Sequence, residues 1–143
     1  MAEINIARFK RMIKFGIIGT SGLVVNNFFL WLFYKQTGVP LAIASPLAIA
    51  IAIFNNFTWN DLFTFRENRH QRKYTYPHRL VRYYASAALG GLINYVTLLF
   101  LTHFFGWPYL ISNLAGIGLG MISNFMLSEF WVFRSKANNE AKN

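Results

Sequence analysis

The chain has 143 residues, of which 55% are hydrophobic, 18% aromatic and only 13% charged. A soluble domain carries about a quarter charged residues on average, so this composition argues against a protein whose surface mainly meets water. The chain contains no cysteine, which excludes disulfide bonds, thiolate metal sites and cysteine nucleophiles. His70, His78 and His103 lie far apart in sequence, and no metal site or cofactor is expected.

Long uncharged stretches, interrupted by KQTGVP at 35–40 and GWP at 106–108, dominate the sequence. A helix needs about 20 apolar residues to cross the hydrocarbon core of a bilayer. Backbone groups in lipid must also satisfy their own hydrogen bonds, which favours helices over isolated strands. The sequence therefore predicts an all-α integral membrane protein with four transmembrane helices, at residues 14–34, 41–61, 82–104 and 109–130. A helical bundle in water would need polar outer faces, which these segments lack. A secretory signal over residues 1–34 is disfavoured because three similar segments follow.

Thirteen of the 14 Lys and Arg residues fall on one side of such a four-span arrangement, and only Lys35 falls on the other. The positive-inside rule then places both termini and the central basic loop, residues 67–78, in the cytoplasm. The net charge of +9 is interpreted as attraction to the anionic lipids of the inner leaflet. A nucleic-acid partner is not expected, because the basic residues flank the spans and form no separate domain.

Shifting the sequence by 68 residues aligns two halves of the chain without a gap over 56 residues. The aligned identities include Gly22 with Gly90, Asn26 with Asn94, Asn56 with Asn124, and Arg66 with Arg134. Shared membrane composition does not readily align glycines, asparagines and arginines in one register. The sequence therefore predicts a single membrane domain built from two parallel-repeat helical hairpins. Repeat 1 covers about residues 8–66, repeat 2 about residues 79–134, and a tail follows at 135–143.

Small and polar residues recur every four positions in the last span of each repeat. These positions are Ala48, Ala52, Asn56 and Asn60 in repeat 1, and Gly116, Gly120, Asn124 and Ser128 in repeat 2. Residues at this spacing share one helix face, and small residues let helices approach closely in lipid. The alanines and glycines are thus interpreted as a packing seam.

Each repeat places two asparagines at increasing depth from the outer turn towards the cytoplasmic side. Asn26 and Asn94 lie roughly 15 Å inside the outer turn, whereas Asn56 and Asn124 lie about 24 Å inside it. The acids and bases that follow are Asp61, Glu129, Arg66 and Arg134, with Lys14 and Arg82 at the mouths of the partnering spans. One interpretation is interhelical hydrogen bonding, worth about 0.6 kcal/mol per amide. The other is a polar path with cations at its entrance. The sequence leaves both open. The aromatics Phe63, Phe65, Trp131 and Phe133 are expected to form an interfacial belt rather than a sugar platform.

The entry segments RMIKFGIIGTSG and RLVRYYASAALGG, the mid-span asparagines, and the ending NF-x2-N-x2-F-x-FR identify a resemblance. The chain resembles the GtrA-like family of small four-span membrane proteins. The second copy departs from the ending at Ser128 and Glu129. The resemblance implies a multi-pass protein of a prokaryotic plasma membrane that moves polyprenyl-phosphate-linked monosaccharides to the outer leaflet, where surface polymers are glycosylated. It also implies a partnership with a membrane glycosyltransferase.

In that function, arginine and lysine would receive the phosphate, since arginine forms a fork matched to it. Amides would replace water around the sugar, because they both donate and accept hydrogen bonds. The predicted phosphate residues are Arg66, Arg134, Lys14 and Arg82. The predicted sugar path comprises Asn26, Asn94, Asn56, Asn60, Asn124, Ser128, Asp61 and Glu129.

Two other functions compete with translocation. One is a non-transporting anchor or partner subunit of a polyprenyl-phosphate glycosyltransferase. The other is a small cation exporter, which would need an acid deep in the membrane, whereas these acids lie at the ends of the spans. Enzymatic activity is not expected, because four spans consume about 84 residues. Four short helices make a thin wall around a path, which is compatible with a homodimer.

Overall fold

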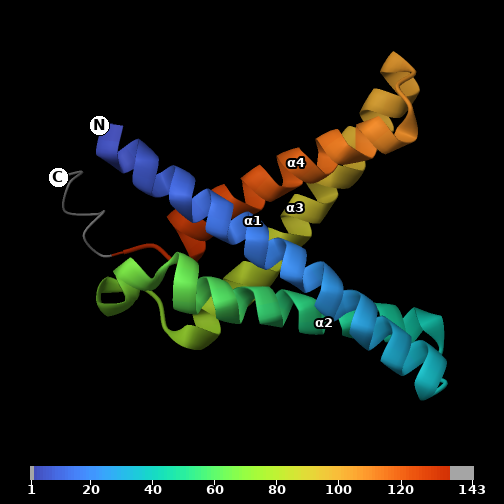
Figure 1. The fold of residues 1–143 in the computed structure, drawn as a ribbon, viewed down its shortest axis with the longest axis horizontal. Coiled ribbons are helices and arrows are strands. Elements are labelled where there is room, and N and C mark those ends of the chain that lie inside the picture. The colour runs from blue at the N-terminus through green and yellow to red at the C-terminus, as the bar shows by residue number, and fades with distance from the viewer. Residues whose placement is uncertain (1, 136–143) are drawn as a thin grey trace. The chain divides into compact units, whose positions relative to one another are not determined.

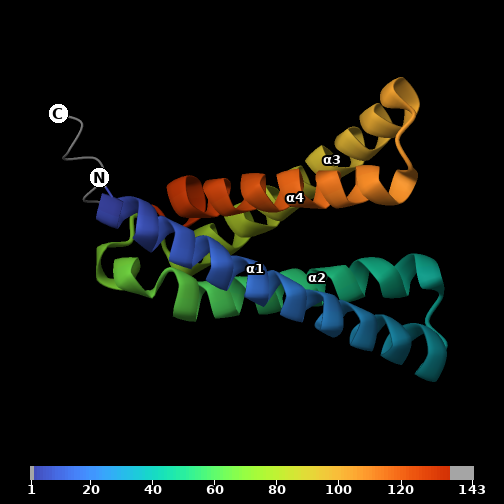
Figure 2. The same ribbon diagram turned by 45° about the horizontal axis from the view of Figure 1, so that its top comes forward.

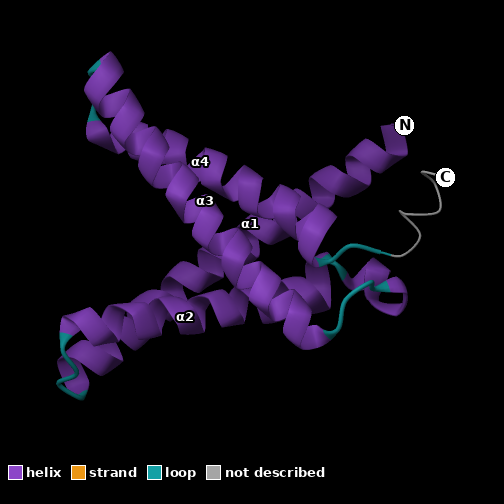
Figure 3. Cartoon of the chain, turned by 180° about the vertical axis from the view of Figure 1, so that it is seen from behind, coloured by secondary structure: helices purple, strands orange, loops and turns teal. Residues whose placement is uncertain are grey.

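The computed structural model describes residues 2–135 and shows an all-helical chain (Figures 1 and 3). Its four long helices are α1 (Ala2–Trp31), α2 (Leu41–Trp59), α3 (Tyr76–Phe105) and α4 (Tyr109–Leu127). Three short π-helical turns, η1 (Leu32–Gln36), η2 (Asn60–Thr64) and η4 (Ser128–Val132), extend α1, α2 and α4, and a 3-10 segment η3 (Arg66–Gln71) follows η2. The predicted fold class is confirmed. All but Ser135 of the predicted tail lies outside the described residues.

The chain divides into two compact units, unit 1 at Met1–Arg69 and unit 2 at His70–Asn143. In unit 1, α1 packs against α2, and in unit 2, α3 packs against α4 (Figure 2). The elements recur at the offset found in the sequence, because α2 and α4 each have 19 residues and η2 and η4 follow them directly.

All four helices are long and apolar enough to cross a membrane. α1 and α3 begin well before the predicted spans, so the basic segments are continuous with them. Residues 2–15 contain neither glycine nor proline, and lysine and arginine are good helix formers. In α3, Pro77 stands in the first turn, where its missing N–H costs no hydrogen bond.

The turns between paired helices are also equivalent in the two units. Gly38 and Gly106 adopt positive φ angles of 73° and 65°, a conformation that favours glycine. Pro40 and Pro108 stand directly before α2 and α4. These residues account for the GVP and GWP breaks between the uncharged stretches.

The packing seam predicted from the small residues is present in both units. In unit 2, a Cβ on Gly90 would lie 2.8 Å from the carbonyl oxygen of Gly120, and a Cβ on Gly120 would lie 2.5 Å from that of Gly90. The backbones of α3 and α4 therefore touch at this crossing. In unit 1, Ala48 and Ala52 are buried on α2.

The two closing motifs end in the same wide turn. The N–H of Phe65 donates to the carbonyl of Asn60, and the N–H of Phe133 donates to that of Ser128. Phe65 and Phe133 are 1% and 0% exposed, so their prediction as members of an interfacial belt was wrong. The π turn rotates these rings inward. Phe63 and Trp131 are exposed, as a belt requires.

Candidate functional site

Two amides of unit 1 have buried oxygens that no described group satisfies. Asn56 on α2 packs its carboxamide against Gly22 of α1, where a Cβ would overlap it. The Oδ1 atoms of Asn56 and of Asn26 are buried and have no hydrogen-bond partner among the described residues. Both oxygens are thus enclosed between the helices without a hydrogen-bond donor from residues 2–135.

The equivalent amides of unit 2 differ from each other. Asn94 on α3 lies against Gly116 of α4, and its buried Oδ1 has no partner within residues 2–135. Asn124 on α4 is satisfied, because Ser86 of α3 donates its hydroxyl to the Asn124 Oδ1 at 2.6 Å. Asn124 therefore acts as an interhelical hydrogen-bonding residue.

The lower part of the predicted path is buried in the π turns. Asn60 is 0% exposed and its Oδ1 accepts a hydrogen bond from Thr64 Oγ1 at 2.7 Å. Asp61 and Glu129 are buried acids at equivalent positions. Ser128 is fully buried, and its hydroxyl lacks a partner in the described part of the chain. These residues remain candidates for contact with sugar hydroxyls.

The four predicted phosphate residues have different surroundings. Arg66 is exposed, and Arg134 is half-buried, with its carbonyl accepting the N–H of Lys73 at 3.0 Å. Lys14 is exposed, whereas Arg82 is half-buried. The last two are sequence equivalents, so this difference separates the repeats.

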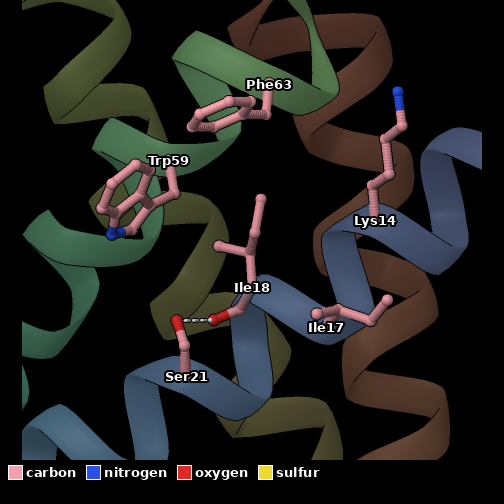
Figure 4. A pocket seen from close by; sticks show the side chains of 6 residues that line it. All are labelled: Lys14, Ile17, Ile18, Ser21, Trp59 and Phe63. Atoms are coloured by element: carbon pink, nitrogen blue, oxygen red, sulfur yellow. Dashed lines mark hydrogen bonds between the residues drawn. The ribbon is translucent and has the colours of Figure 1, made fainter.

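A cavity of about 530 Å³ lies on unit 1 between α1 and the end of α2 (Figure 4). Its lining is apolar except at two residues, and consists of Lys14, Ile17, Ile18, Ser21, Trp59 and Phe63. Trp59 and Phe63 stack with ring centroids 5.4 Å apart and line one side of the cavity. Ser21 donates its hydroxyl to the Ile18 carbonyl at 2.7 Å, so the cavity presents mainly hydrocarbon. We call it the aromatic groove.

A second cavity of about 300 Å³ adjoins it through Lys14. This basic pocket is lined by Ile6, Ala7, Lys10, Arg11, Lys14 and Glu67. An Arg11 Nη1 atom lies 3.7 Å from Glu67 Oε2, and the Glu67 side chain is 79% exposed. Lys14 thus stands where a hydrocarbon-lined cavity meets a charged one.

In unit 2, aromatic rings surround the corresponding cation. The Arg82 guanidinium carbon lies 3.7 Å from the Tyr74 ring centroid and 4.8 Å from that of Trp131. Its Nη1 also donates to the Trp131 carbonyl at 3.3 Å. Arg79, the equivalent of Arg11, is buried and donates to the Tyr74 carbonyl at 2.8 Å.

The sequence of this chain matches a known family of membrane domains. Residues 14–133 match the transmembrane domain described as GtrA/DPMS. The chain belongs to the GtrA/DPMS transmembrane domain family. With its four apolar helices, it is a multi-pass membrane protein.

A curated relative of this GtrA/DPMS chain is a dolichol-phosphate mannosyltransferase from Pyrococcus furiosus. The two are 38% identical over 118 residues, which are 82% of this chain. The chain spans only 32% of the relative's length.

Sequence reasoning found the amides and cations of this GtrA/DPMS chain but missed both cavities. None of Lys10, Arg11, Glu67, Ile17 and Trp59 is among the site residues that the sequence predicts. A signal did exist, because Trp59 and Phe63 lie four residues apart and therefore share a helix face with each other. The match of this face to Lys14 depends on how α1 and α2 pack, which spacing alone does not specify.

Proposed function

We propose that the chain translocates a polyprenyl-phosphate-linked monosaccharide from the cytoplasmic to the outer leaflet of a prokaryotic plasma membrane, for glycosylation of surface polymers. Membership of the GtrA/DPMS family supports a role with such lipids. The printed name of the Pyrococcus relative supports it too, since dolichol phosphate is a polyprenyl-type phosphate. The proposed role is not enzymatic.

The observation that carries the proposal is the pair of equivalent amides, Asn26 and Asn94, whose buried oxygens both lack a partner in the described structure. An unsatisfied buried acceptor costs about 1–3 kcal/mol, and in lipid no solvent relieves that cost. Interhelical hydrogen bonding does not explain such oxygens. We propose that a transient polar guest donates hydroxyl groups to both of them.

The chemistry of the substrate fits this arrangement. The prenyl tail can stay in lipid, so only the phosphate and the sugar need to cross. In the proposed path, cations at the cytoplasmic side hold the phosphate, and the amides replace water around the sugar. The acids Asp61 and Glu129 would accept hydrogen bonds from sugar hydroxyls or position the arginines.

Purified protein in vesicles tests the proposal directly. A labelled polyprenyl-phosphate-linked sugar is placed in one leaflet, and its arrival in the other is followed with a membrane-impermeant reagent. Asn56→Ala or Arg66→Ala should abolish transfer while leaving expression intact. Asn27→Ala is a matched control, because Asn27 is an exposed amide next to Asn26. Wild-type transfer by either Asn56→Ala or Arg66→Ala would overturn the path.

A second candidate is a non-transporting partner subunit of a polyprenyl-phosphate glycosyltransferase. It is favoured by the fact that the chain matches only a third of a longer protein named as a mannosyltransferase. The same vesicles discriminate the two. Transfer by this chain without the enzyme supports translocation, whereas no transfer by this chain alone supports the partner role.

A further inference from the structure

We propose that repeat 1 carries the binding site for the polyprenyl phosphate, with the phosphate at Lys14 and the first isoprene units in the aromatic groove, and that the corresponding place in repeat 2 is closed. This inference rests on the proposed function and assigns its lipid to one half of the duplicated chain. It also changes the sequence-based prediction, which treated Lys14 and Arg82 alike.

The argument for repeat 1 begins with two adjoining cavities of opposite character. The aromatic groove is apolar, and the basic pocket is bordered by Lys10, Arg11 and Lys14. A lipid that carries a phosphate on a hydrocarbon tail has a charged part and an apolar part in the same way. Lys14 lines both cavities and therefore lies where the phosphate of such a lipid would meet its tail. Lysine is a point charge that binds phosphate without a fixed orientation.

The groove favours a prenyl chain as its occupant. Its volume lies within the range of about 300–1,000 Å³ typical of ligand pockets. The stacked rings of Trp59 and Phe63, inclined by 26°, supply apolar aromatic surface for methyl-bearing isoprene units. Ile17 and Ile18 supply branched hydrocarbon on the opposite helix.

The closure of repeat 2 comes from two tyrosines, one just before its first helix and one at its first position. Tyr74 and Tyr76 lie over the guanidinium groups of Arg82 and Arg79, respectively. At the offset of 68 residues their counterparts are Ile6 and Arg8, which belong to the continuous helix α1. Repeat 1 therefore lacks these aromatic rings, and Ile6 instead lines the basic pocket. The cation that is half-buried beneath aromatic rings in repeat 2 is exposed in repeat 1.

Lipid binding to the full chain in mild detergent tests the assignment. The probe is a polyprenyl phosphate, and the bound fraction is measured by native mass spectrometry. Lys14→Gln should weaken binding about tenfold or more, because a charge-assisted contact is lost. Arg82→Gln should change it less than Lys14→Gln does. Lys35→Gln, which removes an exposed lysine in η1, beyond the other end of α1, serves as the control for net charge. Equal losses with Lys14→Gln and Arg82→Gln would overturn the assignment.

The tail is tested separately from the phosphate. Ile17→Phe fills the groove and keeps the charge of Lys14, and it should lower binding several-fold. Leu23→Phe adds the same ring at an exposed position of α1 outside the groove and should not. Helical circular dichroism and a single gel-filtration peak establish that each variant is folded. Unchanged binding by Ile17→Phe would exclude the groove.

The chain contains no cysteine, so the alkylation rate of a single introduced cysteine measures the accessibility of that position only. The polyprenyl phosphate should protect Ile17→Cys from alkylation and should leave the repeat 2 equivalent, Ala85→Cys, reactive. Phosphatidylglycerol at the same concentration should not protect. Equal protection by phosphatidylglycerol would mean a general anionic-lipid site and would overturn the assignment to a prenyl chain. Lipid binding at Lys14 together with no transfer in vesicles would contradict the translocation proposal and leave the assignment of the binding site intact.

Discussion

In the first repeat, Lys14 is exposed at the junction of two cavities, whereas its counterpart Arg82 is packed between the rings of Tyr74 and Trp131. The helices that carry these cations are of equal length and similar sequence. The difference arises from the residues before and after the aligned cations. Duplication has thus preserved the frame of the two hairpins while the surroundings of the cations diverged.

One of the two amide pairs, Asn56 and Asn124, also differs between the repeats, whereas Asn26 and Asn94 are alike. Asn124 accepts a hydrogen bond from Ser86, but the residue equivalent to Ser86 in repeat 1 is Ile18. Asn56 keeps an unsatisfied oxygen beside Gly22. Repeat 2 therefore uses this amide to hold two helices together, and repeat 1 leaves the oxygen of the equivalent amide without a partner among the described residues. This contrast favours repeat 1 as the half that meets the substrate.

The largest expected effect is on the helix crossing of repeat 2. Gly120→Ala would place a Cβ 2.5 Å from the Gly90 carbonyl oxygen, and the two backbones would have to separate. Overpacking of this kind costs about 1–3 kcal/mol, and we expect the upper end because backbone atoms clash. Unfolding in mixed micelles measures the loss. Gly118→Ala is the control, since nothing lies within 4 Å of its Cβ. Equal stability of the two variants would contradict a close crossing.

A smaller effect is expected when repeat 2 is opened. Tyr74→Ala removes a ring from the Arg82 guanidinium, and a cation–π contact contributes about 1 kcal/mol. The thermal midpoint in detergent should fall slightly, and native mass spectrometry should show a second bound polyprenyl phosphate. Tyr95→Ala, at an exposed position of α3, should change neither. A single bound lipid in both variants would mean that Tyr74 does not close the site.

The smallest expected effect concerns the hydrogen bond between Ser86 and Asn124. A double-mutant cycle with Ser86→Ala and Asn124→Ala isolates the coupling between the two side chains. Interhelical hydrogen bonds in membranes average about 0.6 kcal/mol, and a coupling of this size is expected. A cycle with zero coupling would remove the argument that Asn124 is structural, and with it one difference between the repeats.

The four helices and the seam of small residues could be predicted from the sequence, because both depend on composition and on the four-residue spacing along one helix. The burial of Phe65 and Phe133 could not, since it follows from a π turn that shifts the helical register. The packing of aromatic rings against the Arg82 guanidinium could not be predicted either. It depends on Tyr74, a residue outside the helix whose direction no periodicity reports. The repeat did single out Asn26 over its neighbour Asn27, because only Asn26 has a counterpart.

The most direct test is mass spectrometry of lipids that co-purify with the protein in mild detergent. The account predicts that wild-type protein and Lys35→Gln carry a polyprenyl-phosphate-linked sugar and that Lys14→Gln has lost it. Equal amounts on Lys14→Gln, or only ordinary phospholipids on the wild type, would contradict the account.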